Sequence, residues 1–371
     1  MREKMNVNNW RLLFALLMMN VVTLQAQTDT INPKNLSIKG KVKKVEDYSY
    51  YLEANAKGDK TIGGKRFNTM PFMEDWTMQK DKPKHSLTNI SYEFDKNGKN
   101  TNVTTYYAEG KPFGTADFTY DFGGRLVKSQ TCFRVSDGDF ITHKKYSYDG
   151  KKRLVKIEEY EGNQMLETIA FEYDKLGNCI ARRKEASFFQ PVNEASHHAG
   201  SKALPSDRVQ EKYTKQEQFQ YNSAKKITFS EESFPEHNVF LRIEKEYNRQ
   251  NKLVKATYLN EEKKETVCTY TYDKNGRLIE TVCTAKDDPS FYHQLNTLYG
   301  TMGKTEIIKS ERGEVLSKKV FDKNGLLKTH RTPAFNHQYK YTFDAKGNWK
   351  EAVLYEQGVP TKLRVRKIQY Y

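Results

Sequence analysis

Apolar and polar residues alternate with a period of two along most of the chain, and short turn signals separate the alternating runs. The clearest examples are YTYDKNGRLI at 270–279 and YTFDAKGNW at 341–349. Their flanks are rich in Tyr, Phe, Thr, Val and Ile, which suit a pleated, half-buried surface. An Asp and a Gly between the flanks mark a tight turn. Each such run predicts an antiparallel β-hairpin.

The hairpin signal repeats. Its aromatic-Asp or aromatic-Asn pairs lie at Phe94-Asp95, Tyr120-Asp121, Tyr148-Asp149, Tyr173-Asp174, Tyr221-Asn222, Tyr247-Asn248, Tyr272-Asp273, Phe321-Asp322 and Phe343-Asp344. Tyr299-Gly300 fills the gap before Phe321 as a decayed copy, so that the spacing is about 22 to 28 residues apart from one interval of 48, between Tyr173 and Tyr221. A period of this size indicates a repeat architecture. The predicted fold is therefore all-β: an antiparallel β-hairpin repeat array in an elongated, twisted and curled meander sheet. A β-propeller is the alternative.

The tetrapeptide DKNG at 273–276 predicts a type I turn with a G1 bulge, in which Asp273 caps backbone N–H groups and Gly276 takes the positive φ. That register places Cys268 opposite Val282. A two-residue type I′ turn at Asn275-Gly276 would instead place Cys268 opposite Cys283. We favour the first register, because it gives Asp273 a role, and it predicts free thiols at both cysteines.

Composition along the chain divides it into four parts. Residues 1–26 have a basic start, an apolar stretch from Leu12 to Leu24 and a small residue at Ala26, which together are typical of a cleaved secretory signal peptide. Residues 27–185 form the N-terminal part of the hairpin array and include a Gly- and Pro-containing excursion at 53–88. A polar, Pro-containing segment at 186–212 predicts a flexible loop insertion. Residues 213–371 form the C-terminal part of the array.

The remaining composition narrows the class of protein. Mean hydropathy is −0.86 and 37% of residues are hydrophobic, with no second apolar run of membrane length. A membrane-spanning strand needs one apolar face, whereas charges fall on both faces of the segment at 151–163. We therefore expect an exported protein, periplasmic, cell-surface or secreted, that is not an integral membrane protein.

The net charge of +15 favours anionic partners. Lysines on exposed strands also protect sheet edges from pairing with other chains. An anionic envelope glycan or a protein is the expected partner, and nucleic acid is disfavoured.

No motif in the chain specifies a reaction. The cysteines lack CxxC spacing, HExxH, GxSxG and Walker A motifs are absent, and His197-His198 are adjacent in the predicted loop. Sequence-adjacent carboxylates such as Glu158-Glu159 would point to opposite faces of a strand. The turn aspartates lack the further ligands of a calcium loop. We therefore predict no catalytic residues, no metal and no cofactor.

Aromatic residues are the one candidate binding feature. The chain has 24 Tyr, 20 Phe and 3 Trp, many at alternate positions that would form rows on a sheet. Such rows stack on sugars or, in the plainer interpretation, hold the sheet together as cross-strand pairs. The candidate ligand-stacking residues are Tyr146, Tyr148, Tyr270, Tyr272, Tyr339 and Tyr341.

The turn sequences YDFGGRL at 120–126, YDGKKRL at 148–154, YDKLGN at 173–178, YDKNGRL at 272–278 and FDKNGLL at 321–327 resemble the YD-repeat family, also called RHS repeats. The resemblance covers roughly residues 90 to 350. It implies hairpins, and it implies little about function, since the family includes secreted toxin casings, cell-surface adhesion proteins and short exported bacterial proteins. This chain looks like the short exported kind.

The sequence thus predicts a non-catalytic exported protein that presents an extended binding or scaffolding surface in the cell envelope, for an anionic polymer or glycan. One alternative is a periplasmic or secreted glycan-active hydrolase with its site in the long excursions. Another alternative is a relic of a toxin-delivery casing, on family analogy alone.

Overall fold

A computed structural model of the protein describes residues 31, 33–34, 36–54, 60–66, 89–107, 110–135, 138–191, 208–288 and 291–371. The predicted signal peptide at 1–26 lies outside the described residues. The chain divides into two compact units: unit 1 comprises residues 1–118 and 319–371, and unit 2 comprises residues 119–318. This division differs from the predicted halves at 27–185 and 213–371.

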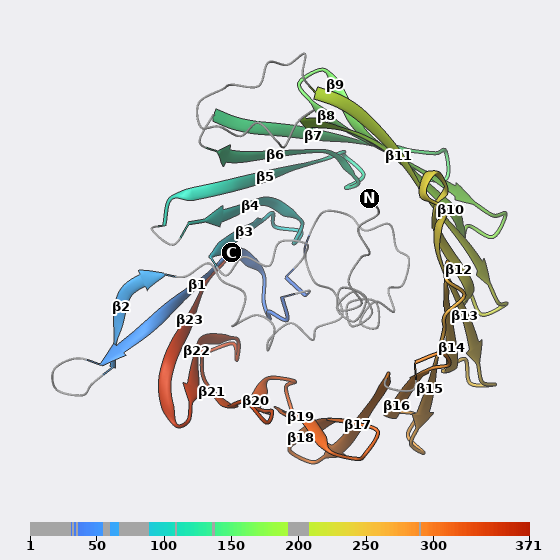
Figure 1. Ribbon diagram of the computed structural model, residues 1–371. Helices are drawn as coiled ribbons and strands as arrows, with labels where there is room; N and C mark the ends of the chain where they lie inside the picture. The colour runs from blue at the N-terminus through green and yellow to red at the C-terminus, as the bar shows by residue number, and fades with distance from the viewer. Residues whose placement is uncertain are drawn as a thin grey trace. The chain divides into compact units, whose positions relative to one another are not determined.

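Unit 2 is an uninterrupted antiparallel ladder in which each strand pairs with its neighbours in sequence, from β6 through β18 (Figure 1). Alternating side chains and short turns favour this arrangement, because consecutive antiparallel strands need no crossover. A 3₁₀ turn, η3 (Pro235–His237), connects β12 to β13. The strands are β6 (Leu126–Val135), β7 (Gly138–Tyr148), β8 (Leu154–Glu161), β9 (Gln164–Tyr173), β10 (Cys179–Pro191), β11 (Arg208–Tyr221), β12 (Ile227–Phe234), β13 (Val239–Tyr247), β14 (Leu253–Asn260), β15 (Glu265–Tyr272), β16 (Leu278–Ala285), β17 (Tyr292–Gly300) and β18 (Gly303–Lys309).

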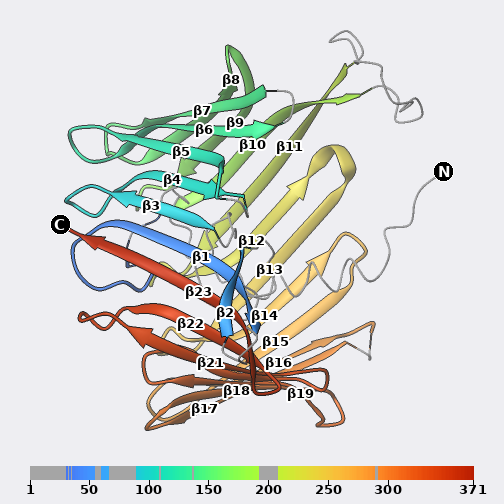
Figure 2. The same cartoon turned by 90° about the vertical axis from the view of Figure 1, so that its left-hand side faces the viewer.

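Unit 1 joins segments from the two ends of the chain. Strand β1 pairs with β23 along one side, and with β3 and β2 along the other. Figure 2 shows β1 and β23 running side by side. The strands are β1 (Val42–Ala54), β2 (Lys60–Arg66), β3 (Ile90–Phe94), β4 (Asn100–Tyr106), β20 (Leu327–Arg331), β21 (Asn336–Phe343), β22 (Trp349–Glu356) and β23 (Val359–Tyr370). Two more strands, β5 (Pro112–Tyr120) and β19 (Val315–Asp322), contain the points at which the units divide.

Two features stabilise the β1–β23 junction. The main hydrophobic cluster of unit 1 includes Val42 and Val45 of β1 with Tyr92 of β3. Beside it, the buried carboxylate of Asp47 accepts hydrogen bonds at 2.7 to 2.8 Å from the guanidinium groups of Arg364 and Arg366 in β23. Burial raises the pKa of Asp47, but the two guanidinium groups outweigh burial and hold it at about 2.

The prediction of an all-β, antiparallel hairpin fold is confirmed, and its finer form is corrected. The hydrogen-bonded ladder of a propeller stops at each blade, whereas the ladder of unit 2 continues through β6 to β18. The β-propeller alternative is therefore wrong. A simple meander, in which each strand pairs only with its sequence neighbours, is wrong for unit 1, because β1 pairs with β23.

The predicted loop insertion at 186–212 and the excursion at 53–88 are both partly strand. Strands β10 and β11 pair as far as Pro191 opposite Arg208. Strand β2 occupies 60–66 and pairs with β1. The Gly63-Gly64 pair and the polar, Pro-containing composition of 186–212 predicted loops, but backbone pairing with a neighbouring strand does not require apolar side chains. Residues 67–88 and 192–207 lie outside the described residues.

The signature turns form as predicted. At 273–276, the N–H of Gly276 donates to the carbonyl oxygen of Asp273 at 2.8 Å, and the N–H of Asp273 donates to the carbonyl oxygen of Arg277 at 2.9 Å. Gly276 has φ +75°, and the Lys252 ammonium lies where its Cβ would be. The positive φ favours glycine here, although Lys152, Lys225 and Asn251 take the same turn position in other hairpins with φ of 65°, 58° and 56°.

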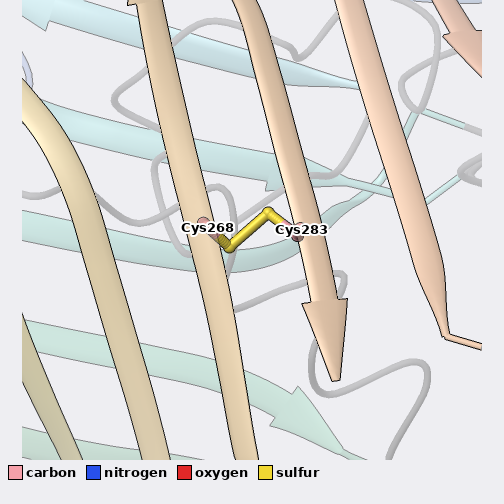
Figure 3. Close-up of a disulfide and its surroundings, with 2 residues drawn as sticks. All are labelled: Cys268 and Cys283. Atoms are coloured by element: carbon pink, nitrogen blue, oxygen red, sulfur yellow. A yellow bond between two sulfur atoms is a disulfide. The ribbon is translucent and has the colours of Figure 1, made fainter. Parts of the chain in front are cut away.

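The cysteine register is a correction. Tyr272 pairs with Leu278 as the predicted turn requires, but Thr271 pairs with Glu280, so that Ile279 is an extra residue. This bulge shifts the register by one and places Cys268 opposite Cys283. The two cysteines form a disulfide between β15 and β16 (Figure 3). The favoured prediction was right about the turn and wrong about the register and the free thiols.

The bulge belongs to the repeat. Six residues after the first residue of the turn, one residue of the second strand has no counterpart in the pairing of the hairpin. A bulge bends the strand and increases its twist. The bulged residues are Thr101, Val155, Ile180, Thr228, Val254, Ile279 and Lys350.

Candidate interaction surface

Each signature turn is closed by its own aspartate or asparagine. In the turn at 273–277, one carboxylate oxygen of Asp273 accepts the N–H groups of Asn275 at 2.9 Å and Arg277 at 2.8 Å. The other oxygen accepts the Arg277 side chain at 2.7 Å. These hydrogen bonds, led by the backbone N–H of Arg277, lower the pKa of Asp273. The Asp273 carboxylate thus bonds to groups of its own turn.

A tyrosine links each turn to the next hairpin, and we call this arrangement a clamp. The hydroxyl of Tyr148 donates at 2.8 Å to the carbonyl oxygen of Leu126, which follows the preceding turn. The Arg125 guanidinium of that turn lies 4.9 Å from the centre of the Tyr148 ring. Equivalent hydroxyl bonds join Tyr173 to Leu154, Tyr221 to Cys179, Tyr247 to Ile227, Tyr272 to Leu253, Tyr299 to Leu278 and Tyr341 to Leu327.

The clamps align the turns of unit 2. Every signature turn follows an odd-numbered strand, so successive turns lie on the same edge of the antiparallel sheet. Each clamp then fixes one turn against the next. We call five of these turns the turn row; they occupy 149–153, 174–178, 222–226, 248–252 and 273–277.

The turn row is strongly cationic. It contains ten Lys or Arg and three Asp, a net charge of +7. Seven of the cations are exposed and form no ion pair with any described residue, and they are Lys151, Lys152, Lys175, Lys225, Lys226, Arg249 and Lys274. Sequence reasoning assigned lysines to edge protection and missed this row. The available signal was that each of these five turns contains at least one Lys or Arg.

The opposite edge of unit 2 has the opposite balance. Its described connections at 235–238, 261–264, 286–288 and 310–314 contain seven Asp or Glu and four Lys or Arg, a net charge of −3. Charge is therefore segregated between the two edges of one sheet, and an anion approaching unit 2 is attracted to the turn row.

The predicted ligand-stacking aromatics all have partners within the protein. Tyr148, Tyr272 and Tyr341 are the clamp residues of their hairpins. A cation lies over each ring, at 4.9 Å for Arg125 on Tyr148 and 5.5 Å for Lys252 on Tyr272.

The other three lie two residues earlier in their strands. Tyr146 is 5% exposed and its hydroxyl lies 3.1 Å from that of Ser129. Tyr339 is 2% exposed within a hydrophobic cluster. Burial raises the pKa of Tyr270, and neighbouring Tyr258 adds to this effect. The six residues thus fall into two sets, the clamp tyrosines and the tyrosines two positions before them in the same strands. Ligand stacking by these residues stays a prediction.

Other chemistry is limited in the described part of the chain. No group of three or more His, Cys, Asp or Glu side chains among the described residues is arranged to hold a metal ion. His197 and His198 lie outside the described residues. Over the same ranges, no helix has the length and apolar character needed to cross a membrane.

Comparison with known proteins gives limited similarity. No family model matches the chain, and no curated protein matches it. Among solved structures, the chain is similar to a Photorhabdus luminescens Tc holotoxin pore carrying a TccC3 mutation, with 14% identity and a TM-score of 0.25 over 84% of this chain. It is also similar to TcdB2-TccC3 without its hypervariable C-terminal region, with 12% identity and a TM-score of 0.19 over 83% of this chain.

The chain spans 20% of the length of each of these two toxin chains. A third similar structure is a porin-like protein from Bacteroides uniformis, with 11% identity and a TM-score of 0.26, covering 88% of this chain and 98% of that protein. Toxin chains are thus among the structural neighbours of this protein at a weak level of similarity, and the YD-repeat resemblance is not matched by a family model.

Proposed function

We propose that this protein is a non-catalytic, exported binding protein whose turn row holds an anionic polymer. The observation that supports the proposal is the alignment, over five clamped turns in unit 2, of seven exposed cations that form no ion pair with the described residues. The aspartates of the same turns do not cancel this charge: Asp149 and Asp273 pair with Arg153 and Arg277, which are not among the seven cations, and the turn row keeps a net charge of +7 with all three aspartates counted.

The spacing of the turns favours an acidic polysaccharide over nucleic acid. Neighbouring strands lie about 4.8 Å apart, so turns that follow every second strand recur at about 9.6 Å and five of them span about 38 Å. That interval is close to the length of one disaccharide. Single-stranded nucleic acid also needs exposed aromatic faces for base stacking, whereas a cation covers the clamp rings Tyr173 and Tyr272.

Hyaluronate oligosaccharides, which carry one carboxylate per disaccharide, are a suitable probe. Affinity should rise with oligosaccharide length, level off once the chain spans about 38 Å, and fall steeply with salt. Neutral dextran of the same length should not bind. Isothermal titration calorimetry at two salt concentrations measures each of these effects.

Paired variants locate the site. Lys225→Gln with Lys226→Gln removes two exposed charges from the turn row, and Lys263→Gln with Lys264→Gln removes two from the opposite edge. An exposed lysine contributes about 1 kcal/mol at an anionic surface and 1.4 kcal/mol is tenfold, so the first pair should weaken binding at least about tenfold. The second pair should leave affinity unchanged. Equal loss in both pairs, or tighter binding of single-stranded DNA than of hyaluronate, would contradict the proposal.

A further inference from the structure

Unit 1 contains a hollow of about 480 Å³ where the N-terminal and C-terminal strands meet. Its walls come from β1, from β3 and β4 with the turn between them, and from the end of β23. These segments are far apart in the sequence, so the hollow exists only in the folded chain. Its volume lies within the range of small-molecule sites.

Irregular backbone shapes the hollow. The register between β1 and β23 shifts between Val42 and Lys44, so Lys43 is an extra, exposed residue at its rim. On the other side, the Tyr371 hydroxyl donates to the carbonyl oxygen of Phe94, and the Tyr371 N–H donates to that of Lys41. The Tyr371 side chain is thus held across the hollow with 49% of the residue exposed.

The two walls carry opposite charges. Lys43 and Lys44 lie on the β1 wall, and Glu93 and Asp95 lie on the β3 wall. Lys44 forms ion pairs with Glu46 at 3.3 Å and with Glu93 at 3.5 Å, whereas Lys43 forms no ion pair with any described residue. The Oδ1 atom of Asp95 caps the turn by accepting hydrogen bonds from the N–H groups of Asn97 and Lys99, and Oδ2 takes no part in these two bonds.

Polar groups without charge complete the lining. Thr101 contributes a hydroxyl and Gln369 an amide, and each of these groups both donates and accepts hydrogen bonds. A peptide group, with one donor and one acceptor, matches that pair. Two cations and two carboxylates also favour a ligand that carries both charges over a polyanion, because Glu93 and Asp95 repel a second negative charge.

We propose that this hollow binds a short zwitterionic peptide of two or three residues. The peptide carboxylate lies at Lys43, its ammonium lies at Asp95 and Glu93, and its backbone contacts Thr101 and Gln369. The site is separate from the turn row, which belongs to unit 2, and it does not depend on polymer binding.

The dipeptide Ala-Ala is the probe, and chemical-shift or calorimetric titration of the full chain measures its affinity. N-acetyl-Ala-Ala-amide, which lacks both charges, should bind at least about tenfold more weakly, as expected for the loss of charge-assisted hydrogen bonds. Equal binding of the charged and blocked dipeptides, or no binding of either at millimolar concentration, would overturn the proposal.

Lys43→Gln should weaken Ala-Ala binding about tenfold, and Lys41→Gln is the matched control because Lys41 is exposed two residues earlier in the chain but does not line the hollow. Unchanged urea midpoints would show that both variants fold. Hyaluronate should not displace the dipeptide. A loss of affinity as large in Lys41→Gln as in Lys43→Gln would place the peptide elsewhere, and displacement by hyaluronate would assign both ligands to one site.

Discussion

Unit 2 is built from neighbours in sequence, whereas unit 1 depends on residues more than 300 positions apart. In unit 2 each hairpin is held to the next by a tyrosine clamp, such as Tyr272 on Leu253, 19 residues away. In unit 1 the decisive contact joins Asp47 to Arg364, 317 residues away. Loss of one clamp removes a single hydrogen bond among many equivalents. Loss of Asp47 leaves two buried guanidinium groups without their carboxylate.

The two units also differ in the contacts that hold a signature turn in place. Strand β22, which follows the last signature turn at 344–348, forms a hairpin with β23, and Tyr370 of β23 takes the place of the clamp tyrosine. Its hydroxyl bonds the Asp344 carboxylate, and the Asn348 amide donates to it at 2.6 Å. Asn348 also accepts the backbone N–H of Lys39 at 2.7 Å. The repeat is therefore completed by a segment from the other end of the chain.

The largest expected effect comes from Asp47→Asn. Removing one partner of a buried ion pair typically costs about 3–5 kcal/mol. The Asp273→Asn variant should cost about 1 kcal/mol or less, because asparagine caps the equivalent turns at 222–226 and 248–252. Urea unfolding of both variants measures the difference. Similar losses in the two would mean that the Asp47 site is no more important than a turn.

The disulfide gives the next largest effect, and it is confined to unit 2. Cys268 and Cys283 are separated by 15 residues, and a loop of that size predicts about 3 kcal/mol of stabilisation. The double substitution to Ala should lower the unfolding midpoint accordingly, and Cys132→Ala should not. Hydrogen exchange should show the loss in β15 and β16, and no protection change there would contradict the assignment.

Acid should weaken unit 1 through Asp47. Its pKa of about 2 lies below the ordinary value of 3.8, so its contribution is complete above about pH 5 and is lost as pH falls from about 5 towards 2. The contribution at neutral pH is about 2–3 kcal/mol. The free energy of unfolding should depend less steeply on pH over this range in Asp47→Asn than in the unmodified protein. An unchanged slope would show that Asp47 does not cause the loss of stability in acid.

A clamp hydroxyl should contribute about 1 kcal/mol, the usual net value of one hydrogen bond. Tyr272→Phe removes the bond to Leu253 and keeps the ring under Lys252. Tyr355→Phe is the control, because the Tyr355 hydroxyl forms no hydrogen bond with the described residues. A loss in Tyr355→Phe as large as in Tyr272→Phe would argue against the clamp.

The smallest effect is a stabilisation. Lys225 has φ +58° at the turn position that glycine occupies elsewhere. A non-glycine residue pays about 1 kcal/mol or more in this conformation, so Lys225→Gly should stabilise unit 2 by about that amount. Lys175→Gly, in a turn whose positive φ belongs to Gly177, should be neutral or destabilising. Thermal unfolding distinguishes the two.

The turns that carry the candidate surface are predictable from the sequence, whereas the turn row itself is not. The turn residues Asp273 and Gly276 act within five positions of each other, and their chemistry predicted the turn correctly. The cations of the turn row occupy these same turns. Their alignment could not be predicted from the sequence, because it depends on the hydrogen bonds of the clamp hydroxyls. The acceptor of each bond is a backbone carbonyl oxygen, which every residue has and which therefore leaves no sequence signal. Tyr148 and Tyr272 are therefore candidate ligand-stacking residues on the sequence alone, and the structure adds that both are clamp residues.

The hairpins, their turns and their repetition follow from the amino-acid sequence alone, since they depend on alternation and on side chains bonding their own backbone. The strand register and the contacts between distant strands depend on the folded chain. The bulge at Ile279, six residues after the start of the turn, is not marked by a particular residue type, yet it places Cys268 opposite Cys283. The pairing of β1 with β23 and the buried contact of Asp47 with Arg366 join residues 319 positions apart. No local pattern records such contacts, because they are selected by the burial of a shared core.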